Sequence, residues 1–209
     1  MTRRRWLILV SLIAAVLTAP AMAQEGPKTS PEQAAKFMEV LSKEALAVLR
    51  TDTAALEQRE AKVRDLLSRN FDLERIGRFV LGKAWPDATP EQRAEYLQLF
   101  SEYVLATYSR RLGGYSGESF KIVKSESLGK SDALVMTEIA RPSGSPLNCG
   151  WRVRTSEDGK QKILDVVVDG LSMINTQRDE FAAVVQKRGM DGLLETLRLQ
   201  TTKFAAQKS

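Results

Sequence analysis

The sequence predicts an α+β domain in which a four-stranded, curved antiparallel sheet has helices packed on one face around an apolar cavity. Helical periodicity fills the first half of the chain, four short β-rich segments follow, and helical periodicity returns at the end. The last β-rich segment is the second indication, because residues 163–168 carry apolar side chains on both faces. We therefore expect this segment to be a central strand.

The helices of the first half begin at capping signals. Ser30-Pro31-Glu32-Gln33 and Thr89-Pro90-Glu91-Gln92 each combine a capping box with proline at the first helical position. The second helix is expected to be capped by Thr51 or Asp52 and to end near Asn70. A further helix is expected between residues 71 and 85, which hold an apolar stripe flanked by arginines.

The β-rich segments are joined by short links of turn-forming residues, which favours an antiparallel meander. The turn Asp169-Gly170 follows the last strand, and Asn175 is expected to cap the next helix. The predicted strands are residues 120–125, 133–141, 148–155 and 160–168, and the predicted closing helices are residues 176–188 and 191–203.

The N-terminus has the pattern of a secretory signal. Three arginines precede an apolar run that is short for a membrane span, and Ala21-Met22-Ala23 supplies small residues at a cleavage site. An uncleaved N-terminal anchor is the alternative. We expect a cleaved signal peptide over residues 1–23, a short leader over 24–29, one α+β domain over 30–204 and a flexible tail over 205–209.

Composition removes several kinds of chemistry. The chain has no histidine and one cysteine, Cys149, so it lacks Ser-His-Asp and Cys-His machinery, the commonest zinc ligand and any intramolecular disulfide. We interpret Cys149 as a buried, apolar thiol and expect no metal site. Removal of the signal lowers the net charge from +5 to +2, which argues against nucleic acid as a partner.

A series of motifs from about Phe71 to Leu197 carries a family resemblance. In chain order they are Phe71-Asp72 with Arg75, Leu81-Gly82 up to Trp85, Ala88-Thr89-Pro90-Glu91-Gln92, Tyr108 before Tyr115-Ser116-Gly117, Asp165-Val166-Val167-Val168-Asp169-Gly170-Leu171-Ser172 with Arg178 and Phe181, and Gly189-Met190-Asp191-Gly192-Leu193. The chain thereby resembles the periplasmic phospholipid-binding proteins of the maintenance of lipid asymmetry (Mla) pathway, the toluene tolerance auxiliary family. It departs from the family pattern at Thr176-Gln177, where many members have Asn-Tyr before the arginine.

The resemblance implies a periplasmic carrier that shelters phospholipid acyl chains between the inner and outer membranes, with no cofactor besides its cargo. It implies an inner-membrane ABC transporter complex with a lipid-binding ring and an outer-membrane lipoprotein complex as partners. The missing tyrosine leaves the precise ligand open. The resemblance also includes relatives associated with hopanoid lipids, so a hopanoid or another membrane lipid is an alternative cargo. An enzyme using Asp165 and Asp169 as paired carboxylates, or an adaptor with a solid core, are the alternatives.

Inward-facing residues are the candidate cavity lining, although direction alone does not separate lining from core. The predicted lining is Leu73, Ile76, Val80, Phe100, Val104, Tyr108, Trp151, Val166, Val168, Met173 and Phe181. Arg178 is the candidate for phosphate contact at the mouth, because we expect it in the first turn of a helix, where free backbone N–H groups favour an anion.

Overall fold

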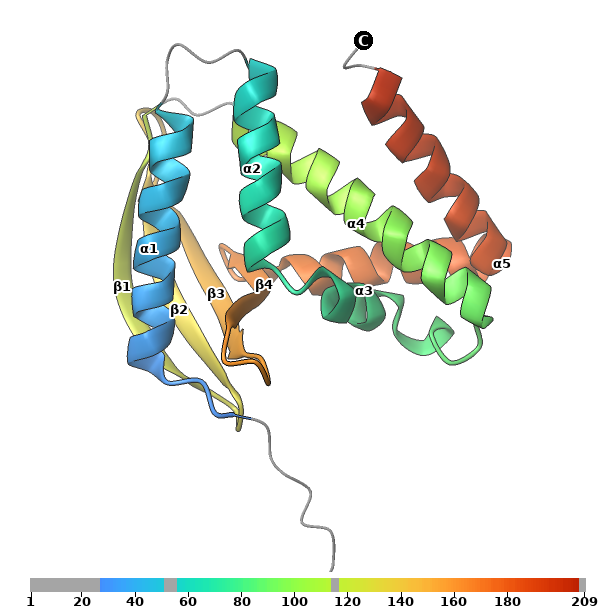
Figure 1. Ribbon diagram of the computed structural model, residues 1–209, viewed down its shortest axis with the longest axis horizontal. Helices are drawn as coiled ribbons and strands as arrows, with labels where there is room; N and C mark the ends of the chain where they lie inside the picture. The colour runs from blue at the N-terminus through green and yellow to red at the C-terminus, as the bar shows by residue number, and fades with distance from the viewer. Residues whose placement is uncertain (1–26, 51–55, 114–116, 207–209) are drawn as a thin grey trace, which may run out of the picture.

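The computed structural model describes residues 27–50, 56–113 and 117–206. Its helices and strands follow the predicted order of helices, meander and helix (Figure 1). The helices before the sheet are α1 (Pro31–Leu49), α2 (Leu56–Asn70), α3 (Leu73–Leu81) and α4 (Pro90–Gly113), with a 3₁₀ turn at Gly82–Ala84. No helix in the described part of the chain is both long and apolar enough to span a membrane.

The sheet is the predicted antiparallel meander, with one strand more than expected. Its order is β1-β2-β3-β4-β5, and every neighbouring pair is antiparallel. The strands are β1 (Ser119–Leu128), β2 (Asp132–Ala140), β3 (Leu147–Thr155), β4 (Gln161–Val168) and β5 (Leu171–Ser172). The prediction of four strands was wrong because the turn at Asp169 and Gly170 folds Leu171 and Ser172 back onto the end of β4.

Local capping signals predicted two helix starts correctly. Ser30 accepts a hydrogen bond from the Gln33 N–H at the start of α1. At the start of α4, the Thr89 hydroxyl accepts from the Gln92 N–H at 3.2 Å, and the Gln92 side chain accepts from the Thr89 N–H at 3.0 Å. The expected caps Thr51 and Asp52 of the second helix lie outside the described residues.

The closing helix, α5 (Met173–Ala206), starts earlier than predicted and breaks at Gly189, where φ is 69°. Asn175 is therefore not its cap. The cap comes from upstream, because the Asp165 carboxylate accepts from the Ile174 N–H at 3.2 Å and the Ser172 hydroxyl accepts from the Asn175 N–H at 3.2 Å. The break at Gly189 separates two helical halves, as the sequence predicted.

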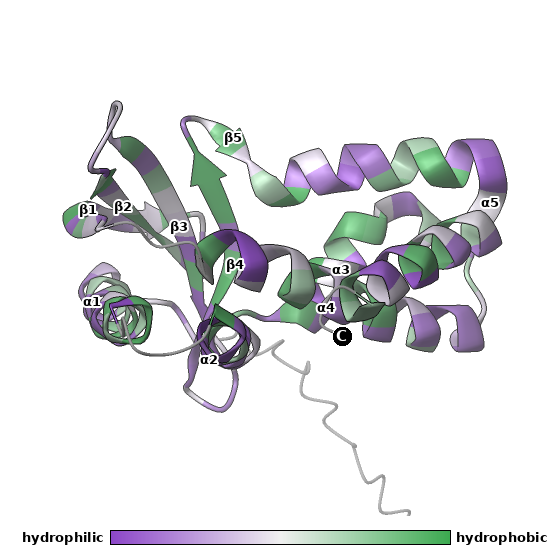
Figure 2. Ribbon diagram, turned by 90° about the horizontal axis from the view of Figure 1, so that it is seen from above, coloured by the Kyte–Doolittle hydropathy of each residue, from purple (hydrophilic) through white to green (hydrophobic). Residues whose placement is uncertain are grey.

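The apolar side chains form two cores, one on each side of β4. The first is a sheet core, in which Ala34 and Met38 of α1 pack on one face of β2, β3 and β4. The second is a helical core, formed by α3, α4 and α5 and centred on Tyr96, Phe100 and Phe181. Figures 1 and 2 show α1 and α2 on the same side of the sheet, with α3, α4 and most of α5 beside it.

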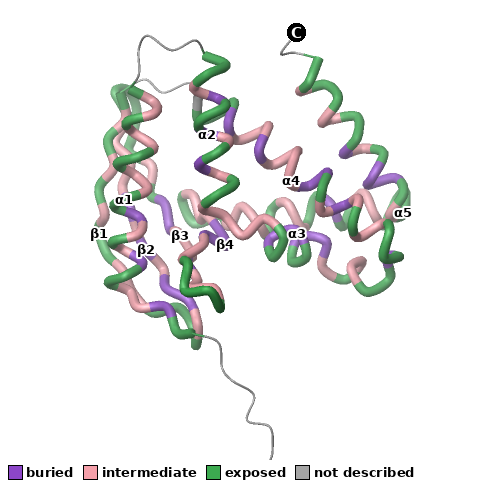
Figure 3. Tube along the Cα trace, viewed as in Figure 1, coloured by how far each residue is buried: buried purple, intermediate pink, exposed green. Residues whose placement is uncertain are grey.

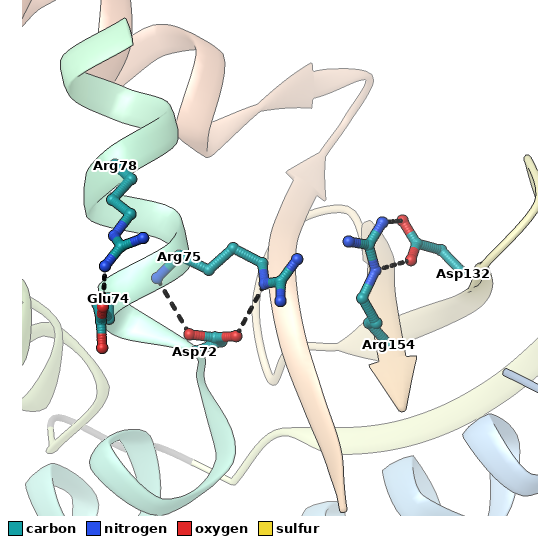
Figure 4. Close-up of polar contacts among 6 residues, drawn as sticks. All are labelled: Asp72, Glu74, Arg75, Arg78, Asp132 and Arg154. Carbon is teal, nitrogen blue, oxygen red and sulfur yellow. Dashed lines mark hydrogen bonds and ion pairs between the residues drawn. The ribbon is translucent and has the colours of Figure 1, made fainter. Parts of the chain in front are cut away.

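Phe71, between α2 and α3, connects the two cores. It packs partly buried against both of them, and its backbone forms a parallel bridge with Ile163 of β4. The next residue, Asp72, donates its backbone N–H to the Ile163 carbonyl and caps α3 by accepting from the Arg75 N–H (Figure 4). The helical layer is thus attached to the sheet directly before α3 begins.

Candidate functional site

Four of the predicted lining residues lie in the helical core. Ile76, Val80, Phe100 and Phe181 are all buried, and Phe100 is 1% exposed. The Phe100 ring stacks on Tyr96 with centroids 5.7 Å apart and meets Phe181 edge-on at 6.2 Å. These side chains are surrounded by the protein's own side chains, so the structure favours a packing role for them.

A second group lies on the face of the sheet that α1 covers. Trp151 of β3 pairs with Val135 on one side and Val166 on the other, and Val168 follows two residues along β4 on the same face. The Trp151 indole N–H donates to the Thr137 hydroxyl at 2.9 Å. Unlike the four core residues, Trp151, Val166 and Val168 are only half-buried.

The remaining lining candidates are half-buried and lie at the edge of the helical layer. Val104 and Tyr108 are four residues apart on α4, Leu73 is the first residue of α3, and Met173 is the first residue of α5. Burial raises the pKa of the Tyr108 phenol, and the nearby guanidinium of Arg111, 5.7 Å from the ring centroid, opposes this shift. Only Val104 of these four packs against the helical core.

Sequence reasoning missed Tyr103, which extends this edge. Its half-buried ring lies 6.3 Å from Phe181 and 6.5 Å from Phe204 of α5. Burial raises its pKa, and the carboxylate of Glu180 raises it further. In the sequence, Tyr103 lies beside the other aromatic residues of α4. Periodicity does not show that its ring contacts both halves of α5, at Phe181 and at Phe204.

Arg178 is placed differently from the prediction. It lies in the second turn of α5, and the backbone N–H groups of Ile174 and Asn175 at the helix start are already bonded to Asp165 and Ser172. Its guanidinium lies over the Phe79 ring, 5.1 Å from the centroid. Among the described residues no carboxylate lies within ion-pair distance of Arg178, so the charge is available to an anion.

Two grooves flank α1, and both are open to solvent. The larger, of about 580 Å³, lies between α1, the end of α2 and the β3–β4 hairpin. The smaller, of about 370 Å³, lies between α1 and β1 and has Leu46, Phe120 and Ile122 in its wall. Neither is the enclosed, waterless hollow that the sequence predicts between sheet and helices, so that hollow stays a prediction.

The carboxylates of the enzyme alternative both have structural partners. Asp165 is buried and accepts from the Ser172 hydroxyl at 2.7 Å as well as from the Ile174 N–H. Asp169 is exposed and accepts from the Asn148 N–H at 3.2 Å. Cys149 is buried, and burial raises its thiol pKa. Within the described residues no group of three potential ligands could hold a metal ion.

One antiparallel sheet, covered by α1 and joined through β4 to a separate helical layer, defines an α+β protein with a divided apolar core. The family model described as MlaC protein matches residues 39–199, and the chain belongs to the MlaC family. A curated relative, the intermembrane phospholipid transport system binding protein MlaC of Haemophilus influenzae, is 25% identical over 205 residues, covering 93% of this chain and 92% of the relative.

A solved structure has the same fold. It is the phospholipid-binding protein from Ralstonia solanacearum in complex with a phospholipid, which matches with a TM-score of 0.71 at 23% identity. The match covers 81% of this chain and 97% of that one. At this identity the likeness establishes the shared fold, and it confirms the predicted α+β class.

Proposed function

We propose that this protein is a periplasmic carrier that shelters the acyl chains of a phospholipid and moves the lipid between the inner and outer membranes. Membership of the MlaC family supports the proposal, as do the phospholipid transport named for the Haemophilus influenzae relative and the phospholipid bound in the Ralstonia solanacearum structure. The observation that carries it is a set of apolar side chains that are only half-buried, two of which pack on the sheet core and one on the helical core. This set, called here the half-buried set, is Leu73, Val104, Tyr108, Trp151, Val166, Val168 and Met173.

The energetics require such a surface. Burying one methylene is worth about 0.8 kcal/mol, so two acyl chains with roughly 30 methylenes gain on the order of 24 kcal/mol over exposure to water. An exposed chain would forfeit about half of that free energy. A carrier must therefore cover nearly the whole hydrocarbon. The half-buried set supplies apolar side chains for this from the sheet and from the helical layer.

In this proposal the acyl chains lie between the sheet and α4. Trp151, Val166 and Val168 face them from the sheet, and Val104 and Tyr108 face them from α4. Figure 3 shows stretches of intermediate burial, in pink, along α4 and the strands. The phosphate is assigned to Arg178, whose guanidinium has no carboxylate partner among the described residues.

The proposal also covers partners and location. The protein works in the periplasm after loss of residues 1–23, and it exchanges lipid with an inner-membrane ABC transporter complex that carries a lipid-binding ring and with an outer-membrane lipoprotein complex. It needs no catalytic group, and in this proposal Asp165 and Asp169 have structural roles through their hydrogen bonds.

Native mass spectrometry of gently purified protein, followed by lipid extraction, tests the cargo. The wild type is expected to carry phospholipid at near one molecule per chain. Val168→Asp is expected to lose the bound lipid, because the new carboxylate would be buried against the acyl chains without a partner. Val123→Asp is the matched control, since Val123 is 62% exposed on β1. Absence of lipid from the wild type, or equal occupancy in both variants, would refute the proposal.

Arg178→Gln tests the headgroup assignment separately. We expect normal folding, because the side chain is partly exposed, together with faster loss of bound lipid to acceptor vesicles. Arg188→Gln serves as the control, since Arg188 lies on the same helix in an exposed ion pair with Glu195. Equal transfer rates for both variants and the wild type would remove Arg178 from the site.

A further inference from the structure

The larger groove beside α1 has the composition of a docking site for a charged ligand. Its lining includes four cations from three separate elements and no carboxylate. The lining residues are Gln33, Lys36, Phe37, Val40, Arg69, Asn70, Thr155, Gly159, Lys160, Gln161 and Lys162. We propose that this groove, called here the α1 groove, binds a short acidic segment of a partner protein, in which an apolar residue lies between carboxylates.

The four cations of the groove differ in whether they already form ion pairs with carboxylates. Arg69 is paired with both Glu44 and Asp65 at 2.8 Å, so it contributes little net charge. Lys160 pairs with the exposed Asp158 at 2.9 Å. Within the described residues no carboxylate lies at ion-pair distance from Lys36 or Lys162, which leaves these two ammonium groups available.

Lys162 is also held in position. Its ammonium group donates to the backbone carbonyl of Arg69, next to the last residue of α2, where the helix dipole favours a positive charge. One of its three N–H donors is used in this contact, and the others remain for a ligand. A fixed cation loses less side-chain entropy on binding than a free lysine does.

The α1 side of the groove includes two apolar residues, Phe37 and Val40. Gln33, Lys36, Phe37 and Val40 form one stripe of α1 at helical spacing, and this stripe faces the groove. Phe37 packs against the sheet core, whereas Val40 is 59% exposed. Apolar residues lined up with basic ones in one groove match a segment that presents one apolar side chain and carboxylates on either side.

The groove joins residues of three elements. Lys36 and Phe37 of α1 and Lys162 of β4 all line it, so a ligand that contacts them together has to lie between α1 and the β3–β4 hairpin. The groove volume of about 580 Å³ suits a few amino-acid residues. Thr155 is also one of the lining residues.

A labelled peptide tests the inference directly on the whole protein. The probe is a fluorescein-labelled, acetylated hexapeptide of sequence Glu-Glu-Leu-Phe-Glu-Glu, followed by fluorescence anisotropy at low salt. The double variant Lys36→Glu/Lys162→Glu is expected to weaken binding by about tenfold or more, since two exposed attractions become repulsions. Val40→Asp is also expected to weaken it, and 0.5 M salt is expected to reduce it strongly.

The control double variant is Lys187→Glu/Lys203→Glu, which makes the same change of net charge on exposed residues of α5. It is expected to bind the probe like the wild type. Equal loss in both double variants, equal binding of a Lys-Lys-Leu-Phe-Lys-Lys peptide, or no binding by the wild type would overturn the inference. Binding to phosphatidylglycerol vesicles that only the Lys36→Glu/Lys162→Glu variant loses, without peptide binding, would overturn it in favour of a membrane surface.

This inference does not depend on the proposed function. Peptide binding is measured without lipid, and lipid occupancy is measured without peptide. A wild type that carries lipid but ignores the peptide would end only the docking inference. A wild type that binds the peptide but never carries lipid would end only the carrier proposal.

Discussion

Neutralising Asp132 should destabilise the sheet far more than neutralising an exposed aspartate. The Asp132 side chain is 3% exposed at the start of β2, and it accepts hydrogen bonds from Arg152 and Arg154 of β3. Figure 4 shows the contact with Arg154. One of these, from Arg154 Nη2, measures 3.0 Å. Asp132→Asn keeps the shape of the side chain but leaves two neighbouring guanidinium groups facing each other without a counter-charge.

The expected cost follows from the exposure of the partners. Removing one member of a buried ion pair costs about 3–5 kcal/mol, because the remaining charge is left uncompensated. Here the Arg152 and Arg154 side chains are 35% and 27% exposed, so water solvates part of their charge. We therefore expect Asp132→Asn to lower the free energy of unfolding by about 2–3 kcal/mol.

Urea denaturation followed by circular dichroism measures this effect. With a urea slope of about 2 kcal/mol/M, the midpoint should fall by about 1 M or more while the slope stays constant. Asp158→Asn is the matched control, since its ion pair with Lys160 is exposed on both sides and its midpoint should not change. A similar shift in both variants, or no shift for Asp132→Asn, would refute the stabilising role of Asp132 between Arg152 and Arg154.

Three further variants test the packing. Gly77→Ala places a Cβ 2.9 Å from the Phe100 ring, so the overpacking cost of about 1–3 kcal/mol should outweigh the better helix propensity, and thermal denaturation should show a lower Tm. Iodoacetamide at pH 8 should modify Cys149 at least tenfold more slowly in the native protein than in urea, because burial raises its pKa; equal rates would contradict this. Asp165→Ala removes the cap from the Ile174 N–H and should cost about 1–3 kcal/mol, and hydrogen exchange confined to the start of α5 should rise.

The sequence predicted helix starts well where the cap is local. Ser30 and Thr89 cap the helices that directly follow them, so their signals lie within four residues. The start of α5 was mispredicted because its cap, Asp165, lies nine residues away on β4. The strand Leu171–Ser172 was missed for a related reason, since two residues have no measurable periodicity and pair only after the Asp169 turn forms.

The candidate site was harder to predict than the fold. Ile76 and Phe100 have the same inward periodicity as Val104, yet the first two are buried in the helical core and the third is half-buried at its edge. Periodicity reports the direction of a side chain and not what lies opposite it. The α1 groove was not predicted at all, because Lys36 and Lys162 come together only when α1 and the β3–β4 hairpin are placed side by side.

The divided core explains why the half-buried set can exist in a stable protein. The sheet core and the helical core each bury their own side chains, and β4 holds the layers together through Phe71 and Asp72 on one side and Asp165 on the other. Folding therefore does not require full burial of Val168 or Tyr108. If these side chains were packed inside one continuous core, hydrocarbon could enter only by displacing them.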